Sequence, residues 1–355
     1  MLARKMDFST YFDRLKVTRD CADRVATRLL ALIRQGRIDF PFRKYFMSET
    51  YVLEKYDDLK KMDIQLETVD SGLLYRFKPE YYEIDMITDL FTENERMKAK
   101  VARLKSPYEM WRTDRNFVKR VIMKAGILSC FNLREAIWAV GKEASQFKVT
   151  AAYAVYKYFN PTRTLDFCAG WGDRLIAALA CSVDYTGYDP NHTLKRGHDQ
   201  IIRTLPHTSP AEIHYRPFED SDDLGTYDLI FTSPPFYNLE TYLDCDRQSS
   251  RRYPDFVQWL VHFLFTVLDI AWSKLVYYGN MIIYIDNVDG NDIITPMTCF
   301  ALTYLPGCTL KGVIQVEGSR KRRRSMYHFY KDPAAKPQRL MYALPEINQY
   351  WLALN

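Results

Sequence analysis

The chain has 355 residues and a formal net charge of +5, from 49 Lys and Arg against 44 Asp and Glu. At 47% hydrophobic and 26% charged residues it can bury a full core, which excludes a globally disordered protein. The mild basic excess is compatible with a polyanionic partner without requiring one. The seven cysteines form no CxxC pair and show no His/Cys ligand spacing, so we expect neither a disulfide framework nor a structural metal.

The N-terminal sequence gives an expectation for localisation. Residues 1–12 lack the long apolar stretch of a signal peptide. No segment approaches the ~18 uninterrupted apolar residues of a membrane span, so we expect no membrane partner. These observations predict an intracellular protein in a reducing compartment, the cytoplasm by default, with the nucleus left open.

The first ~145 residues predict mainly helices, because apolar residues recur at helical spacing with charges between them. Ser106-Pro107 predicts a helix start, since proline is tolerated in the first turn. The helices predicted around it are 11–35, 93–104, 116–125 and 132–144. We therefore expect residues 1–146 to form a mainly helical N-terminal domain.

After Pro161 short apolar runs alternate with amphipathic stretches, the pattern of βα units around a parallel sheet. The predicted strands are 164–167, 184–188, 211–215, 227–232 and 280–285. The helices predicted between them are 173–181, 193–204 and 254–276. Two last strands, 309–316 and 325–330, predict an antiparallel hairpin that closes the sheet of an α/β domain over 147–332, followed by a tail, 333–355.

An acidic residue and two glycines stand at the end of the first of these strands. The strand ends in Asp166, and Gly170 and Gly172 lie in the turn that opens the next helix. Glycines let the backbone approach a ligand closely and adopt unusual dihedral angles. Taken alone, a strand–helix turn with incidental glycines explains this segment equally well.

Asp189 ends the next predicted strand, about twenty residues beyond the glycine turn, where an acidic side chain can accept hydrogen bonds from ribose hydroxyls. A nicotinamide-type fingerprint would share this logic. However, its GxGxxG spacing is not satisfied, because Leu175 stands three residues past Gly172. The two features in this order favour a nucleotide-like ligand over an incidental turn.

The most specific segment is Ser233-Pro234-Pro235-Phe236, directly after the strand 227–232. Prolines donate no backbone hydrogen bond and fix φ, so this loop is rigid and presents free carbonyls. A serine oxygen and a bare carbonyl can accept both hydrogens of a planar amino group, and the aromatic after them can stack on the ring that bears it. A surface turn would explain the prolines but not the whole set.

The three segments together resemble the motifs of class I methyltransferases that act on exocyclic amino groups of DNA bases. Residues 165–174 resemble the family's D-P-F-A-G-S-G element, and residues 233–236 resemble its [SND]-P-P-[FYW] element. The resemblance covers about residues 147–332 and implies a Rossmann-like sheet. The sequence departs from the usual pattern at Cys168 and Trp171.

The resemblance implies S-adenosyl-L-methionine as the cofactor. Asp189 would hold its ribose, and Phe218 or Glu219 would border its adenine. The other cofactor contacts implied are Asp166, Ala169, Gly170 and Gly172 at the methionine end, with Lys148 and Thr150 ahead of the first strand.

The resemblance also implies direct methyl transfer to a base that has left the stack. The base would stack on Phe236, and Ser233 and the Pro234 carbonyl would orient its amino nitrogen beside Pro235. Serine at 233 resembles the cytosine-N4 branch of the family. An N6-adenine site would need the same acceptor on a longer side chain. Methylation of RNA or of a free nucleotide, and a non-catalytic nucleic-acid-binding subunit, stay open as alternatives.

Two further expectations concern contact with nucleic acid. The catalytic half has no room for a separate base-reading domain, so residues 1–146 would hold it, unless the enzyme reads little sequence. The basic run lies at the tip of the predicted hairpin and comprises Arg320, Lys321, Arg322, Arg323 and Arg324. We expect it to contact phosphates, against the alternatives of a solvated loop or a nuclear targeting signal.

Overall fold

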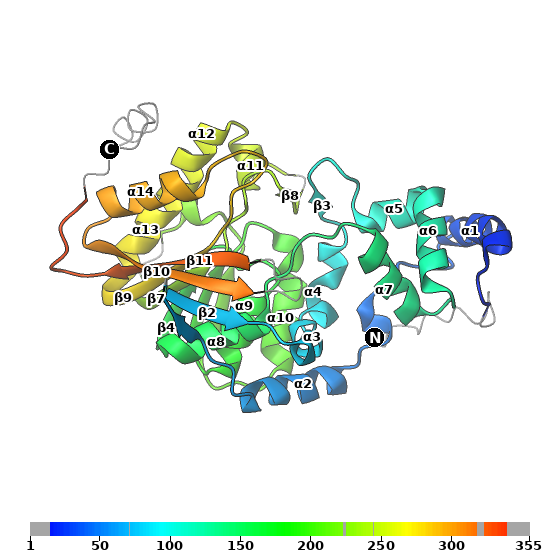
Figure 1. Cartoon of the computed structure of the whole chain (residues 1–355), viewed down its shortest axis with the longest axis horizontal. Helices are drawn as coiled ribbons and strands as arrows, with labels where there is room; N and C mark the ends of the chain where they lie inside the picture. The colour runs from blue at the N-terminus through cyan, green and yellow to red at the C-terminus, as the bar shows by residue number, and fades with distance from the viewer. Residues whose placement is uncertain (1–14, 71, 223–224, 244, 318–322, 339–355) are drawn as a thin grey trace. The chain divides into compact units, whose positions relative to one another are not determined.

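The protein is described by a computed structural model that covers residues 15–70, 72–222, 225–243, 245–317 and 323–338 (Figure 1). The chain forms two compact units. The helical unit comprises Met1–Glu54, Ile87–Ser145 and Glu240–Tyr242. The sheet unit comprises Lys55–Met86, Gln146–Leu239 and Leu243–Asn355. The predicted single boundary at 146 therefore needs correction, since 55–86 belong with the sheet and 240–242 with the helices.

The sheet unit is built on a nine-stranded sheet in the order β1-β2-β10-β11-β9-β7-β4-β5-β6. Its strands are β1 (Glu67–Val69), β2 (Gly72–Arg76), β4 (Arg163–Asp166), β5 (Asp184–Tyr188), β6 (Ala211–His214), β7 (Tyr227–Thr232), β9 (Leu275–Tyr284), β10 (Cys308–Glu317) and β11 (Arg323–Lys331). Strands β6, β5, β4, β7 and β9 are mutually parallel. Strand β11 is antiparallel to both β9 and β10, which confirms the Rossmann-like α/β sheet with a closing hairpin.

Helices cover both faces of this sheet (Figure 1). One face carries α8 (Val149–Phe159), α9 (Asp173–Ala180) and α10 (Lys195–Thr204). The other carries α12 (Phe256–Trp259), the π-helical turn η6 (Leu260–Phe265), α13 (Thr266–Lys274) and α14 (Ile294–Tyr304). Short elements complete the unit: η3 (Pro79–Tyr81), α3 (Tyr82–Asp85), η4 (His192–Leu194), η5 (Phe218–Asp220) and α11 (Ser249–Arg252).

The helical stretch Phe256–Lys274 is long and apolar enough to cross a membrane by length and composition, with a mean hydropathy of 1.4. Its sequence is interrupted by Gln258, His262 and Asp269. Trp259, Leu264 and Leu268 along it are buried in the main apolar core of the sheet unit. It therefore packs as a core helix of this unit.

The helical unit contains α1 (Arg19–Arg34), η2 (Arg43–Tyr45), α4 (Asp89–Arg96), α5 (Pro107–Thr113), α6 (Arg115–Ala125) and α7 (Cys130–Val140). Helix α2 (Glu49–Lys61) continues from this unit into the other. The Ser106 hydroxyl accepts a hydrogen bond from the Glu109 N–H at 3.1 Å, which confirms the predicted helix start. The predicted helix 93–104 is wrong beyond Arg96, because Lys100–Val101 forms β3 and pairs with β8 (Glu240–Thr241).

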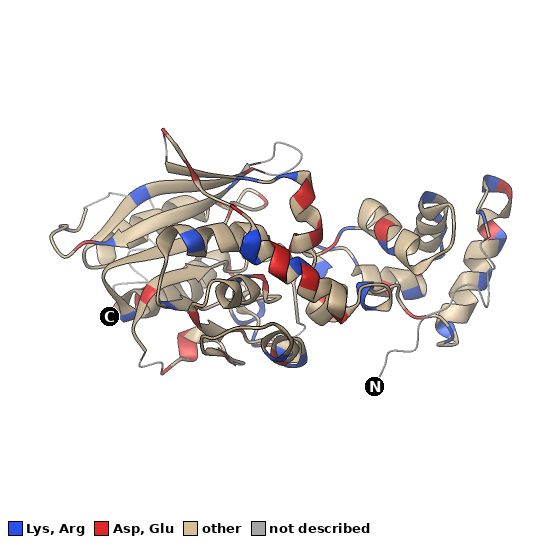
Figure 2. Ribbon diagram, turned by 90° about the horizontal axis from the view of Figure 1, so that it is seen from below, with Lys and Arg blue, Asp and Glu red and all other residues tan. Residues whose placement is uncertain are grey.

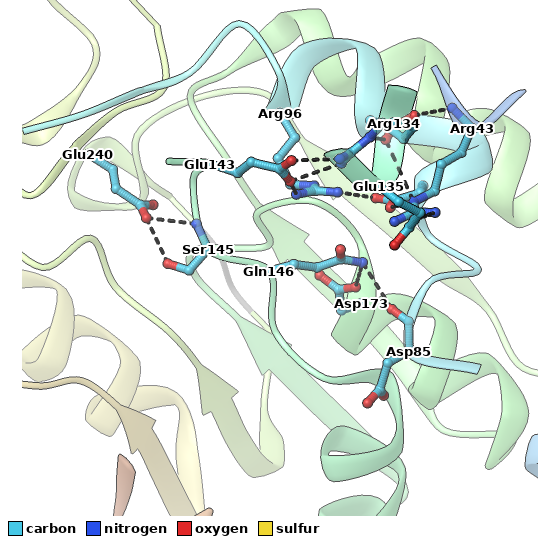
Figure 3. Close-up of polar contacts among 12 residues, drawn as sticks. Arg43, Asp85, Arg96, Arg134, Glu135, Glu143, Ser145, Gln146, Asp173 and Glu240 are labelled. Carbon is cyan, nitrogen blue, oxygen red and sulfur yellow. Dashed lines mark hydrogen bonds and ion pairs between the residues drawn. The ribbon is translucent and has the colours of Figure 1, made fainter. Parts of the chain in front are cut away.

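A network of buried charges organises the helical unit (Figure 3). Arg134 donates from Nε to Glu93 at 2.5 Å and from both terminal nitrogens to Glu143 at 2.6 and 2.9 Å. Arg96 joins Asp89 at 2.6 Å and Glu143 at 2.9 Å. Arg43 continues the network to Asp89 at 2.9 Å and to Glu135 at 2.8 Å. Three buried cations thus meet three buried carboxylates, which compensates their desolvation.

Candidate functional site

The candidate site lies where the strand order reverses. The chain leaves β4 for β5 and β6 on one side and returns with β7 on the other side of β4. In open α/β sheets ligands bind outside the carboxyl ends of the strands at such a point. The Cys168 N–H donates to the Thr232 hydroxyl at 3.1 Å, which ties the loop after β4 to the loop after β7. The two sequence motifs are therefore neighbours in the structure.

Asp166 is fully buried and its carboxylate is engaged within the protein. Arg174 donates to it from Nε at 2.8 Å and Nη2 at 3.2 Å, and the Tyr185 hydroxyl donates at 2.7 Å. Arg174 also donates to the Cys168 carbonyl. The buried pair thus fixes the path of the glycine loop between β4 and α9.

The glycine loop uses backbone conformations that favour glycine. Gly170 has φ +59° and Gly172 has φ +102°. A Cβ at Gly172 would lie 2.7 Å from the Ile201 side chain, whereas a Cβ at Gly170 would meet only the Cys168 carbonyl oxygen, at 3.8 Å. The backbone conformation of Gly172 therefore favours glycine, and Gly170 leaves open space beside the loop.

His198 supports the loop from α10, and sequence reasoning missed it. Its Nε2 lies 2.9 Å from the Gly170 carbonyl oxygen and its Nδ1 lies 3.0 Å from the Tyr215 hydroxyl. Burial lowers the pKa of His198 to about 4. The ring is therefore neutral at neutral pH, with Nε2 donating to Gly170 and Nδ1 accepting from Tyr215.

Asp189 lies at the carboxyl end of β5 beside the same loop. One carboxylate oxygen accepts from the Gly170 N–H and the other from the Asn191 N–H, both at 2.8 Å. Each oxygen keeps a further acceptor site, because an ionised carboxylate offers about four. Burial raises the pKa of Asp189 to about 6. The group can therefore accept two hydroxyl hydrogens from a ligand.

Three predicted cofactor residues have contacts within the protein, and their contact with the cofactor stays a prediction. Phe218 is 2% exposed and stacks on Phe167, with ring centroids 5.5 Å apart. Thr150 is fully buried, donates to Asp85 at 2.8 Å and is bonded to the Tyr75 hydroxyl. Lys148 pairs with the same Asp85 carboxylate at 3.5 Å. A core position and a structural network at the start of α8 account for these side chains.

Gln146 extends the network at the start of α8, since its side-chain amide donates to the Asp85 carbonyl at 3.1 Å and to the Asp173 carboxylate at 2.9 Å (Figure 3). The start of α8 is thereby tied to the first turn of α9.

Glu219, the other residue predicted to border the adenine, is paired with Arg252. Burial raises the pKa of Glu219 to about 7. Arg252 reaches Glu219 at 3.3 Å and Asp220 at 2.7 and 2.9 Å. The positive charge of Arg252 is therefore neutralised by this pairing.

The loop Ser233–Phe236 presents free acceptors. Ser233 and Pro235 are partly buried and Pro234 is buried. Within the described part of the chain, neither the Ser233 hydroxyl nor the Pro234 carbonyl has a hydrogen-bond partner. The next residue, Tyr237, has φ +51° and its hydroxyl donates to the Pro254 carbonyl. The Tyr237 ring packs against Trp259, with the two ring centroids 5.6 Å apart, and this contact helps to hold the residue in its positive-φ conformation.

Phe236 belongs to an aromatic group that the sequence did not indicate. Its ring centroid lies 5.9 Å from that of Tyr284 at the end of β9, and Tyr284 lies 4.9 Å from Phe147. Arg324 donates to the Tyr284 hydroxyl at 3.1 Å. These residues come from distant segments, so only the sheet order brings them together.

Part of the predicted basic run lies outside the described residues, namely Arg320, Lys321 and Arg322. Arg323 begins β11, opposite Glu317 of β10. Met326 pairs with Tyr284, the last residue of β9. Strand β10 therefore ends, and β11 begins, at the carboxyl edge of the sheet, the edge that carries the candidate site. Among the described residues no group of three or more His, Cys, Asp or Glu side chains is arranged to hold a metal ion.

No protein-family model matches this chain, and no curated protein matches it. Solved structures are similar over about half of it. TrmN from Thermus thermophilus is 14% identical with a TM-score of 0.39, covering 52% of this chain and 49% of TrmN. An rRNA methylase from Streptococcus thermophilus is 10% identical with a TM-score of 0.38, covering 53% and 99%. The N-methyltransferase NodS from Bradyrhizobium japonicum WM9, in complex with S-adenosyl-L-homocysteine, is 14% identical with a TM-score of 0.32, covering 50% and 87%.

The matched part thus spans about half of the TrmN chain. The function of this chain is therefore inferred from its own residues and not from these similar structures.

Proposed function

We propose that this protein is an S-adenosyl-L-methionine-dependent methyltransferase that modifies an exocyclic amino group of a DNA base, with cytosine N4 favoured. The observation that carries the proposal is the pair of acceptors Ser233 and Pro234, which have no hydrogen-bond partner among the described residues and lie beside the aromatic Phe236. They lie next to a glycine loop whose neighbour Asp189 keeps a further acceptor site on each carboxylate oxygen. Acceptors for an amino group beside a nucleotide-type cradle match amino methylation.

The cofactor cradle fits the groups of S-adenosyl-L-methionine. The open space beside Gly170 admits the close approach of a ligand to the backbone. Asp189 has acceptor sites for both ribose hydroxyls, and Glu219 offers a carboxyl group at the adenine end. The cofactor would supply an electrophilic methyl group on a sulfonium. Asp166 and Arg174 would act indirectly, by fixing the loop.

We expect the affinity for S-adenosyl-L-methionine to fall below pH 6, by up to about tenfold per pH unit, because the protonated Asp189 loses an acceptor site. Above pH 6 the carboxylate is ionised and the affinity should be constant. In the free protein the sign is the opposite: the folded state holds this proton more tightly, so the free energy of unfolding should fall as pH rises from about 4 to 6.

Calorimetric titration of the cofactor between pH 5 and 8 measures this effect. Asp189→Asn should weaken binding at pH 8 by ~1–3 kcal/mol and abolish the pH dependence between 5 and 7. Asp199→Asn, at an exposed carboxylate paired with Lys195, is the matched control. An unchanged affinity in a folded Asp189→Asn variant would reject the ribose assignment.

On the substrate side, the Ser233 hydroxyl and the Pro234 carbonyl would accept the two amino hydrogens and aim the nitrogen. Held in this way, the nitrogen lone pair would point at the methyl group that the cofactor supplies, and the one N–H proton lost on transfer would leave to water. Positioning and electrostatics supply the acceleration, with no covalent intermediate on the protein. Cys168 is no candidate nucleophile, because burial raises the pKa of its thiol well above the ordinary value.

The base itself would stack on Phe236, within reach of Tyr284 and Phe147. Serine has a shorter side chain than the Asn or Asp of other members, which favours the cytosine branch. N6-adenine in DNA is the alternative product. Modification of RNA or of a free nucleotide, and a non-catalytic nucleic-acid-binding role, remain the competing functions.

We expect transfer of a tritiated methyl group to single- or double-stranded DNA, and N4-methylcytosine in the digested product. Phe236→Ala should lower turnover about 5- to 100-fold through lost stacking, and Ser233→Ala should lower it as well, with cofactor affinity unchanged. Tyr277→Ala, an exposed aromatic on the same sheet, should retain full turnover. If the product is N6-methyladenine, only the cytosine assignment is rejected. If RNA is methylated in place of DNA, the substrate is RNA. Full turnover in either Phe236→Ala or Ser233→Ala would reject the assignment of these residues to the base pocket.

A further inference from the structure

Charge is divided unequally between the two units. The helical unit contains 23 Lys and Arg against 15 Asp and Glu, a net charge of +8. The sheet unit contains 26 against 29, a net charge of −3. Both signs occur along each unit (Figure 2), but the basic excess of the whole chain resides in the helical unit. This unit is therefore the one that attracts a polyanion.

Two antiparallel helices of this unit, α6 and α7, carry a surface rich in cations and aromatics. Asn132 at the start of α7 donates to the carbonyl of Ile127 just past α6 at 3.1 Å. At the other end Gly141 lies against the Phe117 ring of α6. The helices thus run side by side over their whole length, and each has a solvent-facing stripe.

The stripe on α7 contains two large exposed aromatics, Phe131 and Trp138, which are 54% and 51% exposed. Their spacing of seven residues puts both on one side of α7, and Lys142 follows just beyond the end of the helix at Val140. Glu135 between them is neutralised by Arg43 at 2.8 Å. The two exposed rings are therefore followed by a positive charge just beyond the end of α7.

The stripe on α6 supplies further cations. Arg120 and Lys124 are exposed, and in the described part of the chain neither they nor Lys142 forms an ion pair. The other cations of α6, Arg115 and Lys119, differ because both pair with Asp23 of α1, at 2.5 and 2.6 Å. The Arg120 guanidinium lies 5.9 Å from the centroid of the Phe117 ring, against which Gly141 at the end of α7 lies, so Arg120 borders α7.

We propose that this α6–α7 surface, defined by Arg120, Lys124, Phe131, Trp138 and Lys142, binds an unpaired nucleic-acid strand. Exposed rings stack on bases of any sequence, while flanking cations contact the phosphates. An apolar protein partner would desolvate three unpaired cations without compensation. The inference rests on the proposed function only for the class of partner: the strand held here would be the one that carries the base to be modified.

The test uses the full chain and a fluorescein-labelled oligothymidylate. Trp138→Ala should weaken binding about 5- to 100-fold, and Trp138→Phe should restore most of the affinity because the ring is kept. Neutralising Arg120, Lys124 and Lys142 to Ala should flatten the slope of log affinity against log salt by about 0.7 for each lost phosphate contact. The wild-type tryptophan fluorescence should be quenched on binding, since the other described tryptophans are buried.

Tyr277→Ala, a 59% exposed aromatic on the sheet unit, is the matched control and should bind as the wild type does. Cofactor affinity and melting temperature should be the same in all variants. Wild-type affinity in Trp138→Ala, or a change in oligomer mass without a change in binding, would overturn the proposal. Oligonucleotide binding that needs Trp138 but leads to no methylation would instead refute the proposed function and leave this surface standing.

Discussion

Arg134→Met should destabilise the protein by about 3–5 kcal/mol. Arg134 is fully buried, and its removal would leave Glu93 and Glu143 without their closest cation. Breaking a buried ion pair from one side has this cost because the remaining charge is uncompensated in a low-dielectric interior. Equilibrium unfolding in urea, followed by circular dichroism, measures the change.

The exposed pair of Arg115 with Asp23 provides the matched control for that experiment, because the same Arg→Met change there should leave the free energy of unfolding nearly unchanged. A loss below 1 kcal/mol in Arg134→Met would mean that the buried network does not hold the helical unit together. Since the unit has two further buried arginines, Arg43→Met and Arg96→Met should show losses of the same order.

Arg174→Met should also cost about 3–5 kcal/mol, and in addition it should abolish measurable cofactor binding. Asp166 would lose its buried partner, and the Cys168 carbonyl would lose its donor. The glycine loop would then no longer be fixed between β4 and α9. Thermal unfolding and cofactor calorimetry together measure both effects.

Arg163→Met, an exposed arginine on the same strand as Asp166, is the control and should change neither quantity appreciably. In the double variant Asp166→Asn/Arg174→Met the buried charge is removed, so much of the stability should return while cofactor binding stays impaired. Normal cofactor affinity in Arg174→Met would contradict the role of this pair in shaping the loop.

The parallel strands could be predicted because their signal is local. The predicted ranges 184–188 and 227–232 coincide with β5 and β7, which are short apolar runs bounded by polar turns. The adjacency of the glycine loop and the Ser233–Phe236 loop also followed, since carboxyl ends of parallel strands share one edge of a sheet.

What could not be predicted depends on contacts between distant segments. Asp89, Glu93 and Arg96 on α4 have the pattern of a solvated helix face, and only Arg43 and Arg134 make them interior residues. Thr150 and Phe218 matched the resemblance by position. Their actual surroundings, Asp85 for one and Phe167 for the other, come from elements 50 or more residues away.

The strands of 67–76 were missed for the same reason. Strand β2 joins the sheet by pairing with β10, about 240 residues later in the chain, so the sequence around β2 contains no signal of this pairing. An isolated segment 147–332 would lack this strand and expose the backbone edge of β10, which favours aggregation.

The interleaving of the two units has a consequence for how the chain acquires its structure during synthesis. The helical unit uses Glu240, whose carboxylate accepts from the Ser145 N–H and hydroxyl, both at 2.7 Å (Figure 3), and whose strand pairs with β3. This residue is translated 95 positions after Ser145. At a translation rate of about 5–20 residues per second, roughly 5–20 seconds pass between the synthesis of the amino-terminal helices and the synthesis of the last segment of their unit. The two units are therefore expected to mature together after the Ser-Pro-Pro-Phe loop has emerged, and not one after the other.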